Sequence, residues 1–173
     1  SALRFDFDNL EIGGRNYALD SKSERAFTGS YNVLYTLSPD KNDLANSQAI
    51  VSFEAKHSNG DPVVPHVYYR TSDGKHNGFS YGENKRTTTE YQKFVIPIDS
   101  DKIPTDMSQY VSLSIRKDNN TTTLHIRNVK LEKGNKATDW TPAPEDMATQ
   151  SQITQLSDAI NLRVMKGDVI NQI

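Results

Sequence analysis

Short segments in which apolar and polar side chains alternate recur along the first 140 residues, and they constrain the fold most. In QAIVSFEAKH (48–57), the odd positions from 49 to 55 are apolar, whereas the even positions from 52 to 56 are polar. A period of two is typical of a strand with one buried face. The predicted strands are 31–37, 48–57, 63–71, 86–98, 110–117 and 122–133. Regularly spaced short strands predict a mainly β fold, an antiparallel β-sandwich or barrel.

Two of these predicted strands contain an irregularity. In 122–133 the apolar positions change from even to odd numbers between Ile126 and Val129, which predicts a β-bulge near Arg127 and Asn128. Pro65 has no N–H to donate, so its strand is expected at a sheet edge or at a bulge. The inward-facing side chains predicted elsewhere include Tyr31, Val33, Tyr35, Leu37, Val111, Leu113 and Ile115.

The sequence after Trp140 has no β-rich run and predicts a helix over residues 145–164. Acidic residues at 145 and 146 suit a first helical turn, because they complement the helix dipole. A narrow apolar stripe follows, made of Ile153, Leu156, Ile160 and Val164. Such a stripe fits a helix that packs on its own domain, or a coiled-coil seam that joins copies of the chain. We favour the seam and expect a homotrimer, because isoleucine at seam positions favours trimers over dimers.

The composition excludes several classes of function. The 173-residue chain has no cysteine, which excludes disulfides, thiolate metal sites and a cysteine nucleophile. Its formal net charge is −2, from 20 basic and 22 acidic residues that are interspersed, so nucleic acid is not expected as a partner. No apolar run approaches the length of a membrane span, and membrane insertion is not expected. Because the chain starts with serine, we expect it to be part of a longer polypeptide.

Two motifs at the ends of the β-rich region carry a family resemblance. RNVKLEKGNKATDWTPAPED (127–146) resembles the C-terminal edge of carbohydrate-binding-module-like jelly-roll domains in receptor-binding or tail-tip proteins of phages and prophages of Gram-positive bacteria. NLEIGGRNYALDS (9–21) resembles the opening of the same domains. The resemblance implies a jelly roll of eight to ten strands over residues 1–140. It also implies a linker and helix over residues 141–173 that leads to a further domain.

The resemblance also implies a function. Such a domain is non-catalytic and belongs to a phage tail protein of the virion, which acts extracellularly on host cell-wall polysaccharide or teichoic acid. Its other expected partners are further tail proteins and copies of itself. Two alternatives remain open: a spacer or trimerisation module of a tail fibre without a sugar site, and the targeting module of a cell-wall hydrolase. No cofactor is expected. Related modules hold a structural calcium ion near their first and last strands, but Asn128 stands where an aspartate would suit the cation better, so no metal site is expected.

Carbohydrate-binding residues are expected between residues 66 and 91. Sugar binding uses flat apolar surfaces together with hydrogen-bonding side chains. His66, Tyr68 and Arg70 share one face of their predicted strand, and residues 73–86 are expected as a long polar loop that carries Tyr81. The selected carbohydrate-binding residues are His66, Tyr68, Arg70, Tyr81 and Arg86. In the alternative interpretation the loop is only solvated, and Tyr69 and Phe79 belong to the core.

The sequence contains no motif of a catalytic centre. The histidines at 57, 66, 76 and 125 are scattered and match no metal-ligand spacing. A glycosidase-like carboxylate pair would have to combine distant residues such as Glu54 and Glu90. No catalytic residue is therefore expected. The one tryptophan, Trp140, lies within the terminal motif, so we expect it to pack structurally against the sandwich.

Overall fold

A computed structural model describes residues 14–29, 32–58, 66–81, 86–116, 121–147 and 155. The chain divides into two compact units, Ser1–Ala143 and Pro144–Ile173. In the second unit the described part is a single helical turn at 144–147 and Gln155. The predicted helix over 145–164 therefore begins where expected, but most of it, with the stripe from Ile153 to Val164, lies outside the described residues.

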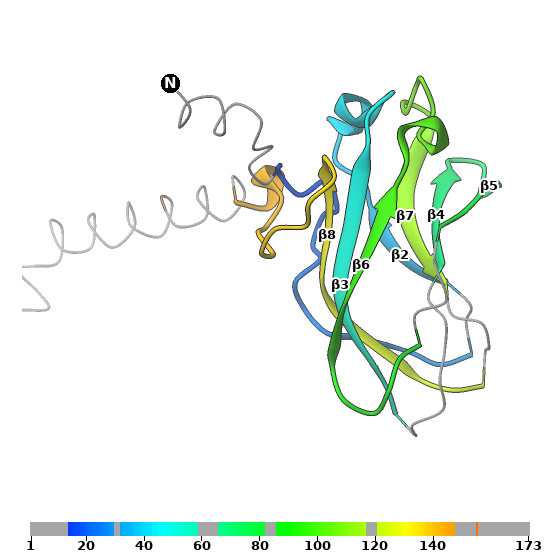
Figure 1. The fold of residues 1–173 in the computed structure, drawn as a ribbon, viewed down its shortest axis with the longest axis vertical. Helices are drawn as coiled ribbons and strands as arrows, with labels where there is room; N and C mark the ends of the chain where they lie inside the picture. Colours follow the sequence, from blue (N-terminus) through cyan, green and yellow to red (C-terminus); the bar gives the residue numbers. More distant parts are fainter. Residues whose placement is uncertain are drawn as a thin grey trace, which may run out of the picture. The chain divides into compact units, whose positions relative to one another are not determined.

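The first unit is an antiparallel β-sandwich of two four-stranded sheets (Figure 1). The strands are β1 (Arg25–Phe27), β2 (Asn32–Thr36), β3 (Ala49–His57), β4 (His66–Thr71), β5 (His76–Tyr81), β6 (Gln92–Ile98), β7 (Tyr110–Arg116) and β8 (Leu124–Lys133), with short 3-10 helices η1 (Lys41–Leu44) and η2 (Ser100–Lys102). One sheet has the order β1-β8-β3-β6 and the other β2-β7-β4-β5. Consecutive strands lie in different sheets except β4 and β5, which pair with each other, and this arrangement confirms the predicted antiparallel β-sandwich.

The alternating residues of the strands meet between the two sheets and form one core. On β3 the odd-numbered residues from Ala49 to Ala55 are at most 1% exposed, as the alternation predicts. Phe53 stacks on Phe94 of the neighbouring strand at 5.4 Å between ring centroids. Tyr69 is fully buried, so the interpretation of this residue as core is confirmed. The other predicted inward positions that are buried are Val33, Tyr35, Leu37, Leu113, Ile115, Leu124, Ile126, Val129 and Leu131.

The predicted bulge in β8 is confirmed. Ser52 pairs with Lys130 and Glu54 pairs with Arg127, so Asn128 and Val129 together lie opposite the single residue Phe53. Asn128 adopts φ 51°, a left-handed conformation that asparagine tolerates better than most residues. The extra residue returns the apolar side chains to the core and leaves the Asn128 side chain on the outer face.

A second bulge, in β7, exposes one residue that the sequence predicts to lie in the core. Arg70 pairs with Ser112 whereas Thr71 pairs with Tyr110, which leaves Val111 as the extra residue of β7. Val111 is 39% exposed, not buried, because the bulge interrupts the alternation at this point.

Three further expectations are corrected. The described part of the strand predicted at 63–71 is β4, and residues 63–65 lie outside the described residues. The expected edge position is wrong, because β4 lies between β7 and β5, whereas the alternative of a bulge is consistent with its register, which shifts against both neighbours. Residues 76–81 of the expected polar loop form β5, since pairing with β4 outweighs the low strand preference of its asparagine and glycine. The strand predicted from residue 86 begins only at Gln92. The three-residue β1 has no alternation long enough to predict.

Within the part of the chain that the structure describes, no helix has both the length and the apolar character needed to cross a membrane.

Candidate functional site

The two motifs at the ends of the β-rich region meet at β8. Asn16 is fully buried there, and its Nδ2 donates to the carbonyls of Val129 and Thr141, both at 3.0 Å. Its Oδ1 accepts from the backbone N–H groups of Ala18 at 2.9 Å and Leu131 at 3.0 Å. One side chain therefore joins the N-terminal segment, β8 and the segment that follows β8.

A second group of contacts fastens the returning segment to β8. Lys130 and Glu132 are almost fully buried, with side chains 2% and 0% exposed and 3.8 Å between Nζ and Oε2. The Lys130 ammonium donates to Thr138 Oγ1 at 2.8 Å and to the Asp139 carbonyl at 2.9 Å, while the Thr138 hydroxyl donates to Glu132 at 2.7 Å. Burial lowers the pKa of Lys130, and the charge of Glu132 partly opposes that effect. We call the whole arrangement the clasp: Asn16, Ser21, Lys130, Glu132, Thr138 and Trp140.

Trp140 completes the clasp through the edge of its ring. The indole N–H lies 3.1 Å from the Val129 carbonyl and 3.3 Å from Ser21 Oγ, which itself donates to Val129 at 2.6 Å. The residue is only half-buried, and it lies on the outer face of the sheet rather than closing the core. The expected structural role of Trp140 is thus met by hydrogen bonds at one edge, and the rest of the ring can line a pocket.

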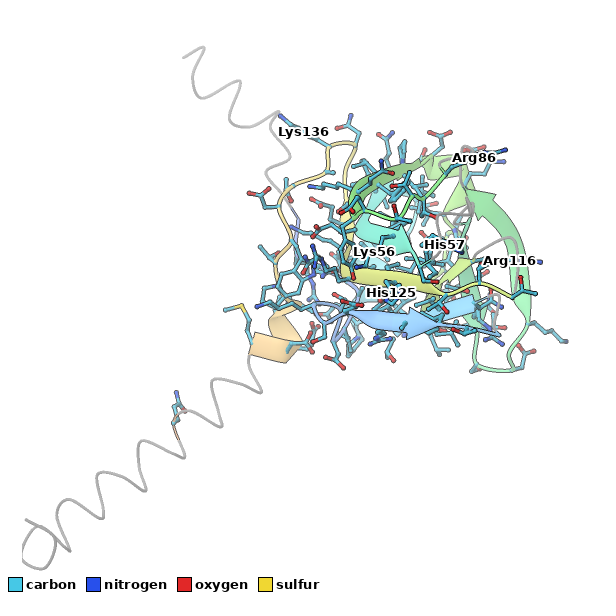
Figure 2. All side chains as sticks on the ribbon, turned by 90° about the horizontal axis from the view of Figure 1, so that it is seen from below. Lys56, His57, Arg86, Arg116, His125 and Lys136 are labelled. Atoms are coloured by element: carbon cyan, nitrogen blue, oxygen red, sulfur yellow. The ribbon has the colours of Figure 1, made fainter. Side chains whose placement is uncertain are left out.

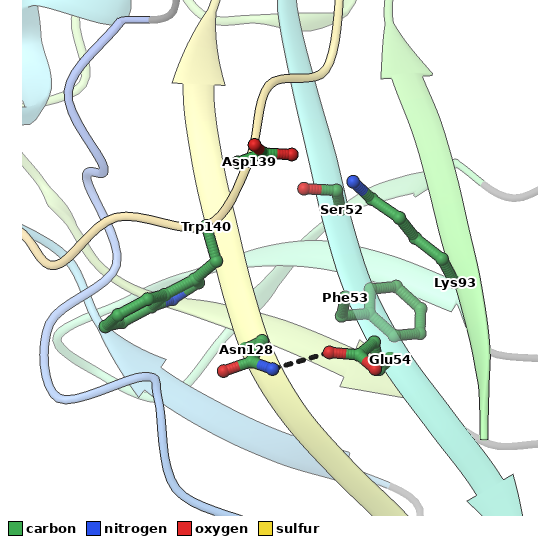
Figure 3. A pocket seen from close by; sticks show the side chains of 7 residues that line it. All are labelled: Ser52, Phe53, Glu54, Lys93, Asn128, Asp139 and Trp140. Carbon is green, nitrogen blue, oxygen red and sulfur yellow. Dashed lines mark hydrogen bonds between the residues drawn. The ribbon is translucent and has the colours of Figure 1, made fainter.

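That pocket lies beside the β8 bulge and has a volume of about 180 Å³ (Figure 3). Its lining residues come from β3, β6, β8 and the returning segment: Ser52, Phe53, Glu54, Lys93, Asn128, Asp139 and Trp140. The Phe53 side chain is buried in the core, so this residue contributes main chain to the floor. In Figure 3 the side chains of Lys93, Asp139 and Ser52 end at the same side of the pocket. We call this site the bulge pocket.

Glu54 is the acidic group on the floor of the bulge pocket. Its carboxylate accepts a hydrogen bond from Asn128 Nδ2 at 2.5 Å and one from Arg127 Nη2 at 3.2 Å. The Asn128 hydrogen bond, followed by Arg127, lowers the pKa of Glu54, while partial burial opposes that shift. Glu54 is therefore ionised at neutral pH and acts as a hydrogen-bond acceptor. A general acid of a glycosidase needs the opposite shift.

The carbohydrate-binding residues predicted from the sequence fall on the other sheet. The backbone register pairs His66 with Arg116, Tyr68 with Ser114 and Arg70 with Ser112. On the other side of β7, the residues Arg116, Ser114 and Ser112 pair with β2, and their partners there are Asn32, Leu34 and Thr36. Three of the predicted residues thus occupy successive cross-strand rows of one sheet face. We call this surface, with Arg116, Ser114, Ser112, Asn32, Leu34 and Thr36, the β4 face.

The other two predicted residues stand apart from these rows. Tyr81 pairs with Val67, which alternates with His66 and Tyr68 along β4. Arg86 is exposed and lies outside the strands (Figure 2). The side chains of His66, Tyr68 and Tyr81 lie outside the described part of the structure, whereas Arg70 is half-buried and donates from Nη2 to the Gly74 carbonyl at 3.0 Å.

Sequence reasoning missed several residues that the fold brings to these two surfaces. Arg116 and Leu34 join the β4 face because of strand pairing, and both are exposed (Figure 2 labels Arg116). Glu54 lies beside Asp139 and Trp140 in the bulge pocket, not beside Glu90. The alternation in β3 predicts that Glu54 faces outward, but no pattern in the sequence predicts that residues 139–140 return over β8. Among the described residues, no group of three or more histidine, aspartate or glutamate side chains could hold a metal ion.

Comparison with known proteins gives structural similarity only. No protein-family profile and no curated protein sequence matches the chain. Among solved structures, the tripod (BppUct-A-L) from the baseplate of bacteriophage Tuc2009 is similar with a TM-score of 0.49 and 12% identity, over 77% of this chain and 60% of that one. The CBM22-1 xylan-binding domain from Paenibacillus barcinonensis Xyn10C is similar with a TM-score of 0.44 and 9% identity, over 73% of this chain and 95% of that one.

A third similar structure is the family 11 carbohydrate-binding module of Lic26A-Cel5E of Clostridium thermocellum, with a TM-score of 0.40 and 17% identity, over 66% of this chain and 75% of that one. Similarities at this level carry no information about the ligand of this chain.

Proposed function

We propose that this chain is a non-catalytic carbohydrate-binding domain of a phage tail protein, which holds the virion on cell-wall polysaccharide or teichoic acid of its bacterial host. One observation carries the proposal. The register of β2, β7 and β4 lines up basic, aromatic, apolar and hydroxyl residues in three adjacent rows of one sheet face.

Those rows offer the chemistry that a glycan needs. The central row combines the exposed aliphatic Leu34 with the aromatic Tyr68, while Ser114 between them is fully buried and donates to Asn32 at 3.2 Å. The row of Asn32, Arg116 and His66 supplies an amide, a guanidinium and an imidazole, which suit sugar hydroxyls or a phosphodiester. Because an antiparallel sheet holds its rows at fixed spacing, such a surface can meet successive units of a polymer with little reorganisation.

The bulge pocket does not supply the general acid of a glycosidase. Its Glu54 carboxylate has a lowered pKa, held by Asn128 and Arg127, and so does not carry the proton that a glycosidase acid must donate. Incubation of the chain with purified cell walls should release no reducing ends or soluble fragments. Measurable turnover would reject a binding-only role.

The binding part is tested with purified cell walls of Gram-positive bacteria and with a glycan array. The intact chain should co-sediment with cell walls, weakly for each copy, since exposed sheet surfaces gain little free energy per contact. Multiple copies on one particle then supply the avidity. Absence of binding to every cell wall and every arrayed glycan would favour the alternative of a fibre spacer without a sugar site.

The place of the domain in a tail fibre is supported by the two terminal motifs, which build the clasp. In this proposal the jelly roll over residues 1–140 is followed by a linker and helix over 141–173 that brings three copies together. Sedimentation over a concentration series tests the assembly. A monomer at every concentration would contradict a trimer formed by this helix.

A further inference from the structure

We propose that the bulge pocket is a second carbohydrate subsite, which takes one uncharged pyranose unit. This inference rests on the proposed function and adds a site on the opposite sheet from the β4 face. The pocket unites an indole ring, two carboxylates, an ammonium, a hydroxyl and an amide within one hollow of the outer sheet face (Figure 3).

The size of the pocket selects a single sugar. Its volume of about 180 Å³ is smaller than the roughly 300–1,000 Å³ of pockets for drug-sized ligands. A single pyranose ring with its hydroxyls suits that space, whereas several linked units do not. The β4 face, in contrast, is an open sheet surface and suits an extended polymer.

The polar groups of the pocket match adjacent hydroxyls. Each sugar hydroxyl both donates and accepts, so a pair of neighbouring hydroxyls needs acceptors and donors side by side. Asp139 and Glu54 accept, Lys93 donates, and the Ser52 hydroxyl and Asn128 amide do both. Glu54 and Lys93 are cross-strand partners on β3 and β6, which fixes their spacing. Trp140 lies at one edge of the pocket, with its ring extending away from Lys93 and Ser52 (Figure 3), and supplies an apolar border for the C–H groups of a pyranose.

The charge of the lining selects against anionic sugars. Glu54 and Asp139 bring two negative charges, Lys93 brings one positive charge, and Arg127 pairs with Glu54 at 3.2 Å. These charges nearly balance, so a uronic acid or a phosphorylated sugar would lose hydration without meeting a net positive charge, which is unfavourable. An uncharged sugar avoids that cost.

The pocket is built before a ligand arrives. The Asp139 main chain is held by the buried Lys130, and the Trp140 indole N–H is held by Val129 and Ser21. The floor is the β8 bulge, where the left-handed conformation of Asn128 aims its side chain at Glu54. Groups that are already fixed lose little conformational entropy on binding, which favours even a small ligand.

The chain carries its own reporter for this site, because Trp140 is the only tryptophan. The intact chain is titrated with free glucose, galactose, mannose, rhamnose, N-acetylglucosamine and N-acetylgalactosamine while tryptophan fluorescence is recorded. At least one of these uncharged sugars should produce a saturable change, with a Kd in about the millimolar range expected for a single sugar. Glucuronate, glycerol phosphate and glucosamine are titrated in parallel.

Variants locate the signal in the pocket. Asp139→Asn and Lys93→Met should each lower the affinity for the responding sugar by about tenfold, since each removes a charge-assisted hydrogen bond. Asp139→Asn keeps the main-chain carbonyl that Lys130 binds. The matched controls Asp101→Asn and Lys102→Met alter an exposed pair in η2 and should change nothing.

The outcomes separate this inference from the proposed function. If cell walls bind but no uncharged sugar changes the fluorescence, the subsite is refuted while the proposed function stands. A stronger response to glucuronate, glycerol phosphate or glucosamine would overturn the ligand class. If Asp139→Asn and Lys93→Met leave the affinity of a responding sugar unchanged, the bulge pocket does not bind it. Absence of binding to both cell walls and sugars refutes both proposals.

Discussion

The two outer faces of the sandwich differ in how their side chains are held. On the β8 side, the clasp fixes buried polar groups through hydrogen bonds that reach across more than 100 residues of sequence, from Asn16 to Val129 and Leu131. On the β4 face, adjacent rows are set by strand register, and side chains such as Leu34 and Arg116 are exposed. Buried, satisfied polar groups such as those of the clasp stabilise the fold, whereas exposed side chains are available for a ligand.

This difference explains why the two ends of the domain are rich in recognisable motifs. In the N-terminal motif, Asn16 and Ser21 make the hydrogen bonds, and in the C-terminal motif Lys130, Glu132, Thr138 and Trp140 make them. Each of these positions needs one chemical group at one place. On the β4 face, Ser114 is also fully buried and donates to Asn32, whereas Leu34, Thr36 and Arg116 are exposed.

The largest effect is expected from Asn16→Ala. The substitution removes the partners of two buried backbone N–H groups, at Ala18 and Leu131. It also removes a donor to the Thr141 and Val129 carbonyls, of which Val129 keeps its hydrogen bonds from Ser21 and Trp140. Each unsatisfied buried group costs about 1–3 kcal/mol, so the free energy of unfolding should fall by about 3 kcal/mol or more. Urea denaturation measures the loss. The control Asn135→Ala, at an exposed position, should change stability by less than about 0.5 kcal/mol.

Thr138→Val should have the next largest effect. It keeps the shape of the side chain but removes the hydroxyl that joins Lys130 to Glu132. Loss of this link should lower the free energy of unfolding by about 1–3 kcal/mol, and Thr138→Ser should recover most of it. Thr105→Val, at an exposed position, serves as the control. Equal stabilities of the two valine variants would show that the clasp does not hold the returning segment.

The sequence predicts the parts of the fold that depend on local patterns, and it does not predict those that depend on contacts between distant segments. The strands β3 and β8, and the bulge at Asn128, follow from local alternation, because burial imposes a period of two and the bulge shifts its phase. The strands β1 and β5 do not follow, since they are short or poor in strand-forming residues and exist through pairing with β8 and β4. The bulge pocket requires the return of Asp139 over β3, which no local pattern contains.

A smaller effect is expected from Glu54→Gln, and it should depend on pH. Asn128 and Arg127 lower the pKa of Glu54 in the folded protein, so this stabilisation is fully present above the ordinary glutamate pKa of about 4.3 and is lost as pH falls through the lower folded-state value. The carboxylate is 32% exposed, so the ion pair contributes about 1 kcal/mol or less at pH 7.

Denaturation of the wild type and of Glu54→Gln at a series of pH values tests this prediction. The difference in stability should shrink as the pH is lowered below about 4, where the wild-type carboxyl gains its proton. The exposed Glu90→Gln variant provides the comparison. A difference that stays constant across the series would mean that Glu54 stabilises the fold by packing rather than by charge.

The smallest effect on stability is expected on the β4 face. Leu34 is 39% exposed, and Leu34→Ala should change the free energy of unfolding by less than about 0.5 kcal/mol. The same variant should bind cell walls more weakly, because it removes apolar surface from the central row of the face. A large loss of stability would show that Leu34 stabilises the fold, and would contradict the difference drawn between the clasp and the β4 face.

The most direct test of the account is co-sedimentation with purified cell walls of the wild type and of Tyr68→Ala, Arg70→Ala and Tyr81→Ala. Urea denaturation of the same samples reports whether each variant is folded. The account predicts that the wild type binds and that the variants bind more weakly while their unfolding midpoints stay close to that of the wild type. Binding of the folded Tyr68→Ala and Arg70→Ala variants at the wild-type level would contradict a carbohydrate site on the β4 face, whatever the result for Tyr81→Ala, which lies outside its rows.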